Sequence, residues 1–461
     1  MHRIDCDVAI IGAGTAGLAA YKAATAEGAH AVLIESGPGG TTCARVGCMP
    51  SKALIAAGRT AHHARQAAMF GVTVGDVTVD GPAVMDRVRR ERDYFVASVM
   101  EDVDAIPADR RIAGHARFTA PGQLSVDGGP DITARTIVIA AGSAPSLPEI
   151  LEPVAEHVRT SDTIFEIPTI PATLAVLGAG VIGLELAAAF ARLGTRVTMI
   201  DKGDVIASIA DPEAERIARD RLAQDFTILL GADLTAADLV DGKIRLAWDG
   251  DHAGDAMFDL VLAAAGRPPV SDTLNLDAAG IDRDDHGTPH FDAGTGRCGD
   301  SMVFIAGDAR ACRPVLHEAA RSGRLAGHNA ARPDDLRRDP ILPPLTITYT
   351  DPQITMVGCD YDELPSDVVI GSATFGDNGR VHIDAAGDGI VRLYADHDGT
   401  VIGATIVGPD AEHPAHMVAL GIACGLTLQE LADQAYYHPT VMEVLQNAAR
   451  DALSTLAKSD A

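Results

Sequence analysis

The pattern of apolar and polar positions predicts two copies of one strand–helix–strand unit. In each copy a short apolar strand leads into a glycine-rich turn, an alanine-rich helix and a second apolar strand. The second strands end on carboxylates, Glu35 in the first copy and Asp201 in the second. The four predicted strands are 7–11, 31–34, 174–177 and 196–200. Buried strands that alternate with helices predict an α/β fold with parallel, doubly wound sheets.

Both turns carry the spacing Gly-x-Gly-x-x-Gly. The glycines are Gly12, Gly14 and Gly17 in the first copy, and Gly178, Gly180 and Gly183 in the second. The first glycine permits a tight turn, the second lets the backbone approach a pyrophosphate, and the third packs the helix against the strand. Glycine-rich turns with a purely structural role are common, but here strand, helix and terminal acid accompany both copies. We therefore expect two bound dinucleotides, as electron transfer between a flavin and a nicotinamide requires.

The pattern changes after residue 340, where Pro343 and Pro344 indicate a linker. The segments predicted as strands, mostly joined by hairpins, are 345–349, 371–375, 389–394 and 401–407. The segments predicted as helices are 413–424, 427–434 and 441–457. This part has no glycine fingerprint, so we expect an α+β domain that binds no nucleotide.

Composition narrows the possible partners. A chain of 461 residues exceeds one ordinary hydrophobic core, so two to four domains are expected. The formal net charge is −27, and only five of the 37 basic residues are lysines. This balance argues against nucleic acid or an anionic membrane surface as a partner, and indicates a strongly solvated surface. The chain has no long uncharged apolar run and enters a strand directly at its N-terminus, so we expect a cytoplasmic protein.

Of the seven cysteines, only Cys43 and Cys48 are close in sequence. A regular helix would hold their Cα atoms about 9 Å apart, whereas a disulfide needs roughly 4.4–6.8 Å. If the two form a bridge, the backbone between them must be bent, and Gly47 and Pro50 suit a bend. Two buried thiols or half of a metal site are the alternatives. No second pair has zinc-like spacing, so no metal is expected.

The segment 40–52, Gly-Thr-Thr-Cys-Ala-Arg-Val-Gly-Cys-Met-Pro-Ser-Lys, resembles the redox-active segment of the pyridine nucleotide–disulfide oxidoreductases. Further motifs similar to those of the family follow in the family's order, at 139–143, 265–268, 303–308, 349–353 and 438–443. Within the family, the dihydrolipoyl dehydrogenases are the most similar members. The resemblance implies three domains formed by four segments of the chain. They are an FAD-binding domain over 1–145 and 270–341, an NAD-binding domain over 146–269, and a dimerisation domain over 342–461.

The resemblance implies a set of residues that bind FAD and NAD. They are Gly12, Gly14, Gly17, Glu35, Thr42, Lys52, Gly142, Asp308, Gly178, Gly180, Gly183, Asp201, Gly266 and Arg267. Asp201 favours NAD over NADP, because a carboxylate repels a 2′-phosphate and accepts a hydrogen bond from a 2′-hydroxyl. A helix that starts near Pro314 is expected to direct its N-terminal amides at the flavin.

The same resemblance assigns the redox chemistry to Cys43 and Cys48. Cys48 is expected to lie against the flavin as a thiolate, and Cys43 to exchange disulfides with the substrate. Lys52 and Glu185 match a family ion pair beside the flavin, although a solvated helix lysine is the alternative for Lys52.

The resemblance also implies that His438 is the catalytic base and that Glu443 orients its imidazole. Most of the sixteen histidines must have no catalytic role, and His438 stands out through Pro439, Thr440 and the carboxylate five residues on. In this family the histidine comes from the partner subunit, which implies a homodimer.

The expected activity is that of a dihydrolipoyl dehydrogenase, which oxidises dihydrolipoamide on a lipoylated carrier protein and reduces NAD. A reductase of another small disulfide, similar to glutathione reductase, and a largely structural subunit of a multienzyme complex are the alternatives. Mercuric reductase would need a C-terminal cysteine pair, and soluble transhydrogenase lacks the paired cysteines found here. Arg45, Ala141 and the pair His317–Glu318 depart from the residues common at these positions.

Overall fold

The computed structural model describes residues 3–340 and 342–459. Residues 1–2, 341 and 460–461, with the parts of the predicted first domain and C-terminal tail that they cover, lie outside the described residues. The chain forms two compact units. Unit 1 comprises 1–50, 88–146 and 267–341, and unit 2 comprises 51–87, 147–266 and 342–461. The mixed α/β fold with parallel sheets and a C-terminal antiparallel domain, as predicted, is confirmed.

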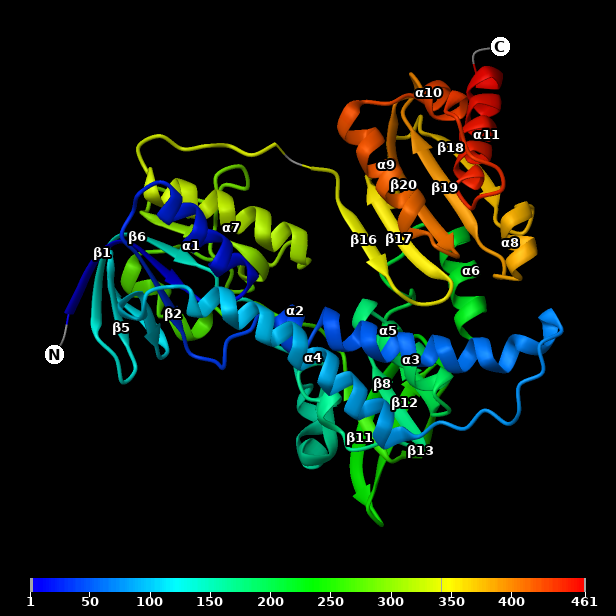
Figure 1. Cartoon of the computed structure of the whole chain (residues 1–461), viewed down its shortest axis with the longest axis horizontal. Helices are drawn as coiled ribbons and strands as arrows, with labels where there is room; N and C mark the ends of the chain where they lie inside the picture. The colour runs from blue at the N-terminus through cyan, green and yellow to red at the C-terminus, as the bar shows by residue number, and fades with distance from the viewer. Residues whose placement is uncertain (1–2, 341, 460–461) are drawn as a thin grey trace. The chain divides into compact units, whose positions relative to one another are not determined.

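Unit 1 is built on a seven-stranded sheet with the order β3-β2-β1-β6-β5-β4, in which β15 also pairs with β6 (Figure 1). The strands are β1 (Arg3–Ile11), β2 (Ala31–Glu35), β3 (Arg111–Ala113), β4 (Ala116–Ala120), β5 (Gln123–Val126), β6 (Asp131–Ile139) and β15 (Val303–Ile305). Strand β1 runs parallel to both β2 and β6, so that Val8 lies level with Ala31 and Thr136. Strands β4 and β5 form an antiparallel extension on the other side of β6.

Helices α1 (Thr15–Ala26) and α7 (Leu316–Ala331) pack closely on each other in unit 1. Small residues make this contact possible. A Cβ atom on Gly323 would overlap the carbonyl oxygen of Ala16, and one on Gly327 would overlap that of Ala20. The two backbones therefore touch along one turn, which explains why the first helix is rich in alanine.

Unit 2 contains the second parallel sheet, with the order β10-β9-β8-β14-β7, and an antiparallel sheet, β11-β12-β13. The strands are β7 (Val158–Thr160), β8 (Thr173–Leu177), β9 (Arg196–Ile200), β10 (Thr227–Leu229), β11 (Ala232–Val240), β12 (Lys243–Gly250), β13 (Gly254–Phe258) and β14 (Leu260–Ala263). Helix α5 (Val181–Arg192) connects β8 to β9, and α6 (Pro212–Leu222) connects β9 to β10. Strands β8 and β9, both predicted from the sequence, bury their apolar side chains, whereas the apolar side chains of the edge strand β10 are only partly buried.

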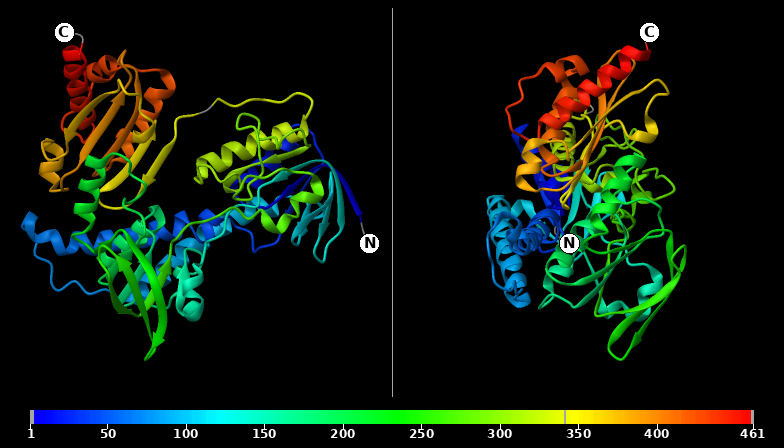
Figure 2. Two further views of the ribbon diagram at one scale, coloured as in Figure 1. Left: turned by 180° about the vertical axis from the view of Figure 1, so that it is seen from behind. Right: turned by 90° about the vertical axis from the view of Figure 1, so that its right-hand side faces the viewer.

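A five-stranded antiparallel sheet with the order β16-β17-β20-β19-β18 also belongs to unit 2. Its elements are β16 (Leu345–Thr348), β17 (Gln353–Gly358), β18 (Val369–Thr374), α8 (Gly379–Asp384), β19 (Ile390–Ala395), β20 (Val401–Gly408), α9 (Glu412–Cys424), α10 (Leu428–Asp433) and α11 (Glu443–Ser459). Helix α11 packs on β18 and β19, as the views from the front and from behind both show (Figures 1 and 2). The sequence pattern missed β17, which lies between β16 and β20.

The predicted redox segment, 40–52, contains helix α2 (Thr42–Arg45) and the start of helix α3 (Cys48–Gln66). Helix α4 (Gly81–Asp104) follows in the chain. Among the described residues, no helix is long and apolar enough to cross a lipid bilayer.

Candidate active site

The first glycine turn has the geometry of a phosphate cradle. Gly12 has a positive φ of 101°, and a Cβ atom there would overlap the carbonyl oxygen of Ala140. A Cβ atom on Gly17 would overlap the carbonyl oxygen of Gly12, so the helix packs tightly on the turn. Around Gly14, by contrast, no described atom outside the glycine and its chain neighbours lies within 4 Å of the position that a Cβ would take. The turn is closed at its first and third glycines and open at its second.

The second glycine turn repeats this arrangement. Gly178 has a φ of 111° and packs against the carbonyl of Ala264, and a Cβ atom on Gly183 would overlap the carbonyl oxygen of Gly178. At Gly180, as at Gly14, no described atom outside the glycine and its chain neighbours lies within 4 Å of the position that a Cβ would take. Two turns far apart in sequence thus share one steric pattern, in which only the middle glycine faces open space.

The two acids that end the second strands, Glu35 and Asp201, are each held by two backbone N–H groups. Glu35 accepts hydrogen bonds from the backbone N–H groups of Ala13 and Gly37, both at 2.7 Å. Asp201 accepts from Ala179 and Gly203, both at 2.6 Å. In each copy one bond reaches the residue between the first two glycines. The carboxylate is therefore held beside the glycine turn, where a ribose would lie if a pyrophosphate bound to the turn.

Both turns fit a dinucleotide. Helices α1 and α5 begin after Gly14 and Gly180, which serve as N-caps and have no side chain to offer their first-turn N–H groups. Such N–H groups and the positive end of the helix dipole bind phosphate. The open space beside each middle glycine is where the pyrophosphate would approach.

Ser143, which was not among the predicted cofactor residues, joins two residues of unit 1 that were. Its hydroxyl donates to Asp308 at 2.9 Å, and its backbone carbonyl accepts from Arg267 at 3.0 Å. The structure thus brings together three of the family-like motifs, those at 139–143, 265–268 and 303–308. Gly266, which precedes Arg267, has a positive φ of 117°. Sequence reasoning did not select Ser143, because its bridging position depends on the packing of three segments.

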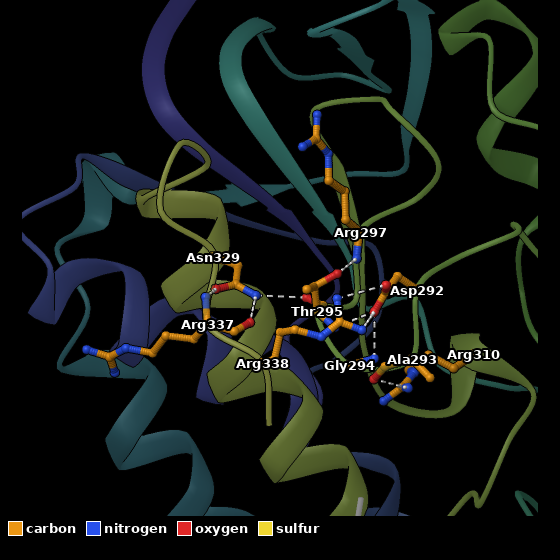
Figure 3. A network of polar contacts seen from close by, with 9 residues as sticks. All are labelled: Asp292, Ala293, Gly294, Thr295, Arg297, Arg310, Asn329, Arg337 and Arg338. Carbon is orange, nitrogen blue, oxygen red and sulfur yellow. Dashed lines mark hydrogen bonds and ion pairs between the residues drawn. The ribbon is translucent and has the colours of Figure 1, made fainter. Parts of the chain in front are cut away.

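A polar network supports the short 3-10 helix that carries Asp308 (Gly307–Arg310). Arg310, which ends this helix, donates to the carbonyl of Ala293 at 3.3 Å (Figure 3). The adjoining loop is anchored by Asp292, which accepts from two backbone N–H groups and from Arg338. Asn329 on α7 ties the same loop to the segment before residue 340 (Figure 3).

Helix α7 begins at Leu316, two residues after the predicted Pro314. Its N-cap is Val315, whose side chain has no polar atom to satisfy the first N–H groups of the helix. His317 and Glu318, which depart from the family pattern, both lie in this first turn.

The backbone is bent between the two cysteines, as the sequence predicts for a pair that could bridge. Cys43 lies in α2 and Cys48 is the first residue of α3, and the helical path is interrupted at Val46 and Gly47. A Cβ atom on Gly47 would lie 3.2 Å from the Cα of Cys43, so the turn folds tightly back on Cys43. A helix N-terminus such as that at Cys48 favours a thiolate. Thr42 is exposed at the start of α2.

Arg45 holds the loop that enters this segment. Its guanidinium donates to the carbonyl of Gly39 at 2.8 Å and packs against Gly40. The departure from the family pattern therefore gives this chain a tie between α2 and the preceding loop.

Two further cysteines are unsuited to redox exchange. Cys298 is buried and Cys6 is partly buried, and burial raises the pKa of each thiol to about 12. Since the thiolate is the reactive form, these two are inert at neutral pH. In the described part of the chain, no group of three or more His, Cys, Asp and Glu side chains is arranged to hold a metal ion.

Lys52 and Glu185 form the predicted ion pair in unit 2. The ammonium of Lys52 lies 3.0 and 2.8 Å from the two carboxylate oxygens of Glu185. Glu185 lies on α5 and its side chain is only 5% exposed, while Lys52 is 36% exposed. A third group, which the sequence did not indicate, completes the arrangement. The backbone N–H of Tyr349 donates to Glu185 at 3.0 Å.

His438 and Glu443 also meet as predicted. The Nδ1 atom of His438 lies 2.9 Å from one carboxylate oxygen of Glu443, and the other oxygen accepts from the N–H of Thr440 at 2.9 Å. The Thr440 N–H and the imidazole of His438 hold the pKa of Glu443 below its usual value. The loop is fastened by buried Asn378, which donates to the carbonyl of Thr440. The imidazole is oriented from its Nδ1 side, and its side chain is 76% exposed.

Comparison with known proteins agrees with this geometry. Residues 6–323 match the family model for pyridine nucleotide-disulphide oxidoreductases, and residues 345–449 match the dimerisation domain of the same family. The chain belongs to this family of flavoprotein disulfide oxidoreductases, enzymes that use FAD and NAD(P).

Relatives match over nearly the whole chain. A dihydrolipoyl dehydrogenase of Halobacterium salinarum is 33% identical over 97% of this chain and 96% of its own. One of Bacillus subtilis is 29% identical over 96% of this chain and 97% of its own. Among solved structures, LpdA from Mycobacterium tuberculosis has a TM-score of 0.84 at 22% identity, covering 98% of this chain and 99% of that chain. The flavoprotein disulfide reductase RclA from Escherichia coli has a TM-score of 0.82 at 22% identity, covering 96% and 99%. These two structures share the fold.

The steric pattern of the second turn predicts that one glycine substitution weakens nucleotide binding and another lowers stability. Gly180→Ala fits the protein but fills the space through which a pyrophosphate approaches. The Kd for NADH should therefore rise about tenfold or more, equivalent to about 1.4 kcal/mol, with an unchanged melting temperature. Gly183→Ala should instead lower the melting temperature, because its Cβ overlaps a backbone carbonyl. Titration with NADH and thermal unfolding distinguish the two, and unaltered NADH binding by Gly180→Ala would contradict the phosphate cradle.

Proposed function

We propose that this chain is an NAD-dependent dihydrolipoyl dehydrogenase, which oxidises protein-bound dihydrolipoamide to lipoamide. The observation that carries the proposal is the pair Cys43 and Cys48, held on either side of a bent backbone with Cys48 at a helix N-terminus. The choice of dihydrolipoamide as the substrate is supported by relatives that match over nearly their full length and are named dihydrolipoyl dehydrogenase.

FAD would be held by the first glycine turn, Glu35 and the group around Asp308, and NAD by the second turn and Asp201. When bound, the flavin supplies a two-electron relay from the reduced cysteine pair to the nicotinamide. The protein's part is to bind both nucleotides, to position the thiols, and to move protons at the substrate sulfur.

In the proposed reaction, which starts from a Cys43–Cys48 disulfide, His438 accepts a proton from one thiol of dihydrolipoamide, and the resulting thiolate attacks the sulfur of Cys43. The bond between Cys43 and Cys48 breaks, and Cys48 leaves as a thiolate. The second substrate thiol then attacks the substrate sulfur of the mixed disulfide, the bond to Cys43 breaks, and Cys43 leaves as a thiol with the proton that the attacking thiol gives up. Lipoamide is released, and both cysteines are left reduced. The exposed imidazole, with Nδ1 engaged by Glu443, presents Nε2 for the proton.

The preference for NAD follows from the fixed carboxylate of Asp201. Because two backbone N–H groups bind both of its oxygens, the side chain cannot rotate away from an incoming nucleotide. A 2′-hydroxyl can donate a hydrogen bond to this carboxylate, whereas the negative charge of the carboxylate repels a 2′-phosphate.

A homodimer is part of the proposal. The match to the family's dimerisation domain covers 345–449 and includes His438. The high exposure of the His438 side chain in the single chain suits a residue that completes the active site of a partner subunit.

The activity is tested by two assays on the purified flavoprotein. Reduction of NAD by dihydrolipoamide should be fast, and reduction of glutathione disulfide by NADPH should be slower by at least about a hundredfold in kcat/KM. An enzyme that prefers NADPH and glutathione disulfide would instead be a glutathione-type reductase.

The two cysteines should give different spectra when substituted. Cys43→Ser leaves Cys48 as a thiolate beside the flavin, so the oxidised protein should show a long-wavelength charge-transfer absorbance. Cys48→Ser should not show it, and both variants should lose activity on the order of a thousandfold. Cys424→Ser, which changes an exposed cysteine at the end of α9, serves as the control. Identical spectra for the two variants would refute the assigned roles.

A mixed dimer should recover activity if each active site is shared. Chains that carry Cys43→Ser and chains that carry His438→Ala are nearly inactive alone. When the two are co-expressed, half of the dimers are mixed, and each mixed dimer has one site without a lesion. Roughly a quarter of wild-type activity should therefore return. Activity at the level of the single variants, in preparations whose mixed dimers are confirmed by mass, would show that the base acts within its own chain.

A further inference from the structure

Both members of the Lys52–Glu185 pair contact the same third residue, Tyr349. The ammonium of Lys52 lies 4.7 Å from the centroid of the Tyr349 ring, within the range of a cation–π interaction. The backbone N–H of Tyr349 donates to the Oε1 atom of Glu185, which also accepts from Lys52. One residue therefore holds the cation with its ring and the anion with its backbone.

The segment that carries Tyr349 is fastened to the helix that carries Glu185. Arg192 donates to the side chain of Asp351 at 2.8 Å and to its backbone carbonyl at 3.1 Å. Glu185 and Arg192 are seven positions apart on α5, about two turns, so both lie on the same face of the helix. This face binds the chain just before and just after Thr350, which is itself buried.

The Arg192–Asp351 contact is partly buried. The side chain of Arg192 is 10% exposed and also binds Asp225 at 2.9 Å. Although burial opposes the charge, Asp351 and Asp225 hold the pKa of this guanidinium above its usual value. Asp225 lies just after α6, so its carboxylate binds the arginine from a different part of the chain than Asp351 does.

The ammonium of Lys52 keeps one position only if neighbouring groups hold it there. The side chain is long and flexible and 36% exposed, and a lysine ammonium is strongly hydrated. Glu185 fixes the ammonium from the α5 side, and the ring of Tyr349 covers another side of it.

We infer that Tyr349 is a positioning residue, which holds Lys52 and Glu185 in one geometry and is itself held by the Arg192–Asp351 contact. This inference rests on the proposed function and on the family resemblance, which implies that Lys52 lies beside the flavin. A positive charge fixed there favours the electron-rich reduced flavin, and it also favours the thiolate of Cys48, four residues earlier in the sequence. Without the ring, the ammonium turns toward water and its effect on both groups weakens.

The test uses the reduced holoenzyme and its thiolate–flavin charge-transfer absorbance. In Tyr349→Leu this absorbance should disappear at a higher pH on acidification, by about half to one pH unit, because a less stabilised thiolate has a raised pKa. The midpoint potential of the flavin should become more negative. Tyr349→Phe keeps the aromatic face and should behave like the wild type in both measurements.

A matched pair of substitutions, one at each carboxylate that Arg192 binds, separates positioning from stability. Asp351→Asn weakens the tie to the Tyr349 segment and should shift both measurements in the same direction as Tyr349→Leu. Asp225→Asn weakens the other contact of the same arginine and should shift neither. If Tyr349→Leu does not fold, this pair carries the test alone.

Three results would overturn the inference: wild-type values in both Tyr349→Leu and Asp351→Asn, an equal shift in Tyr349→Phe, or an equal shift in Asp225→Asn. Failure of the proposed function would look different. If only the proposed substrate were wrong, the assays with dihydrolipoamide and glutathione disulfide would show it while the variants kept their expected shifts. If the roles of the two cysteines were wrong, the reduced wild-type enzyme would itself show no charge-transfer absorbance.

Discussion

The arrangement of unit 2 depends on the buried carboxylate of Glu185. A carboxylate that is 5% exposed is stable only when charged and hydrogen-bonded partners replace the water it has lost. Here those partners come from two other segments, Lys52 on α3 and the backbone of Tyr349 after β16. The requirement to satisfy one side chain therefore fixes three segments to one another. The second βαβ helix, which begins at the nucleotide turn, thereby also organises the group around Lys52.

The two nucleotide turns show how one steric solution can be used twice. In both, the outer glycines are required because backbone carbonyls occupy the space of a side chain, and the middle glycine leaves open the space that a bound nucleotide would take. In both, the terminal carboxylate bonds to the same relative backbone positions. The repeat is thus present in hydrogen bonds and sterics as well as in sequence, and the two sites differ in the acid each presents.

Several residues of the candidate site were accessible from sequence and several were not. The pairing of His438 with Glu443 is local, because five residues separate them and one loop can join them. The bend between Cys43 and Cys48 is also local, and Gly47 signals it. Ser143 and Asn378 carried no comparable signal. A serine or asparagine becomes a bridge only when packing brings distant segments within hydrogen-bonding distance of it.

The sequence by itself determined the features that short stretches of backbone control: the two glycine turns, the strands that flank them, the spacing of the cysteines and most strands of the C-terminal sheet. These follow from the steric freedom of glycine and from periodicities of two or 3.6 residues, which act over a few neighbours. Only the tertiary structure decided that β17 lies inside the antiparallel sheet and that Tyr349 contacts Lys52 and Glu185. Lys52 and Glu185 are 133 residues apart. Their contact depends on how whole helices and strands pack, which local periodicity does not encode.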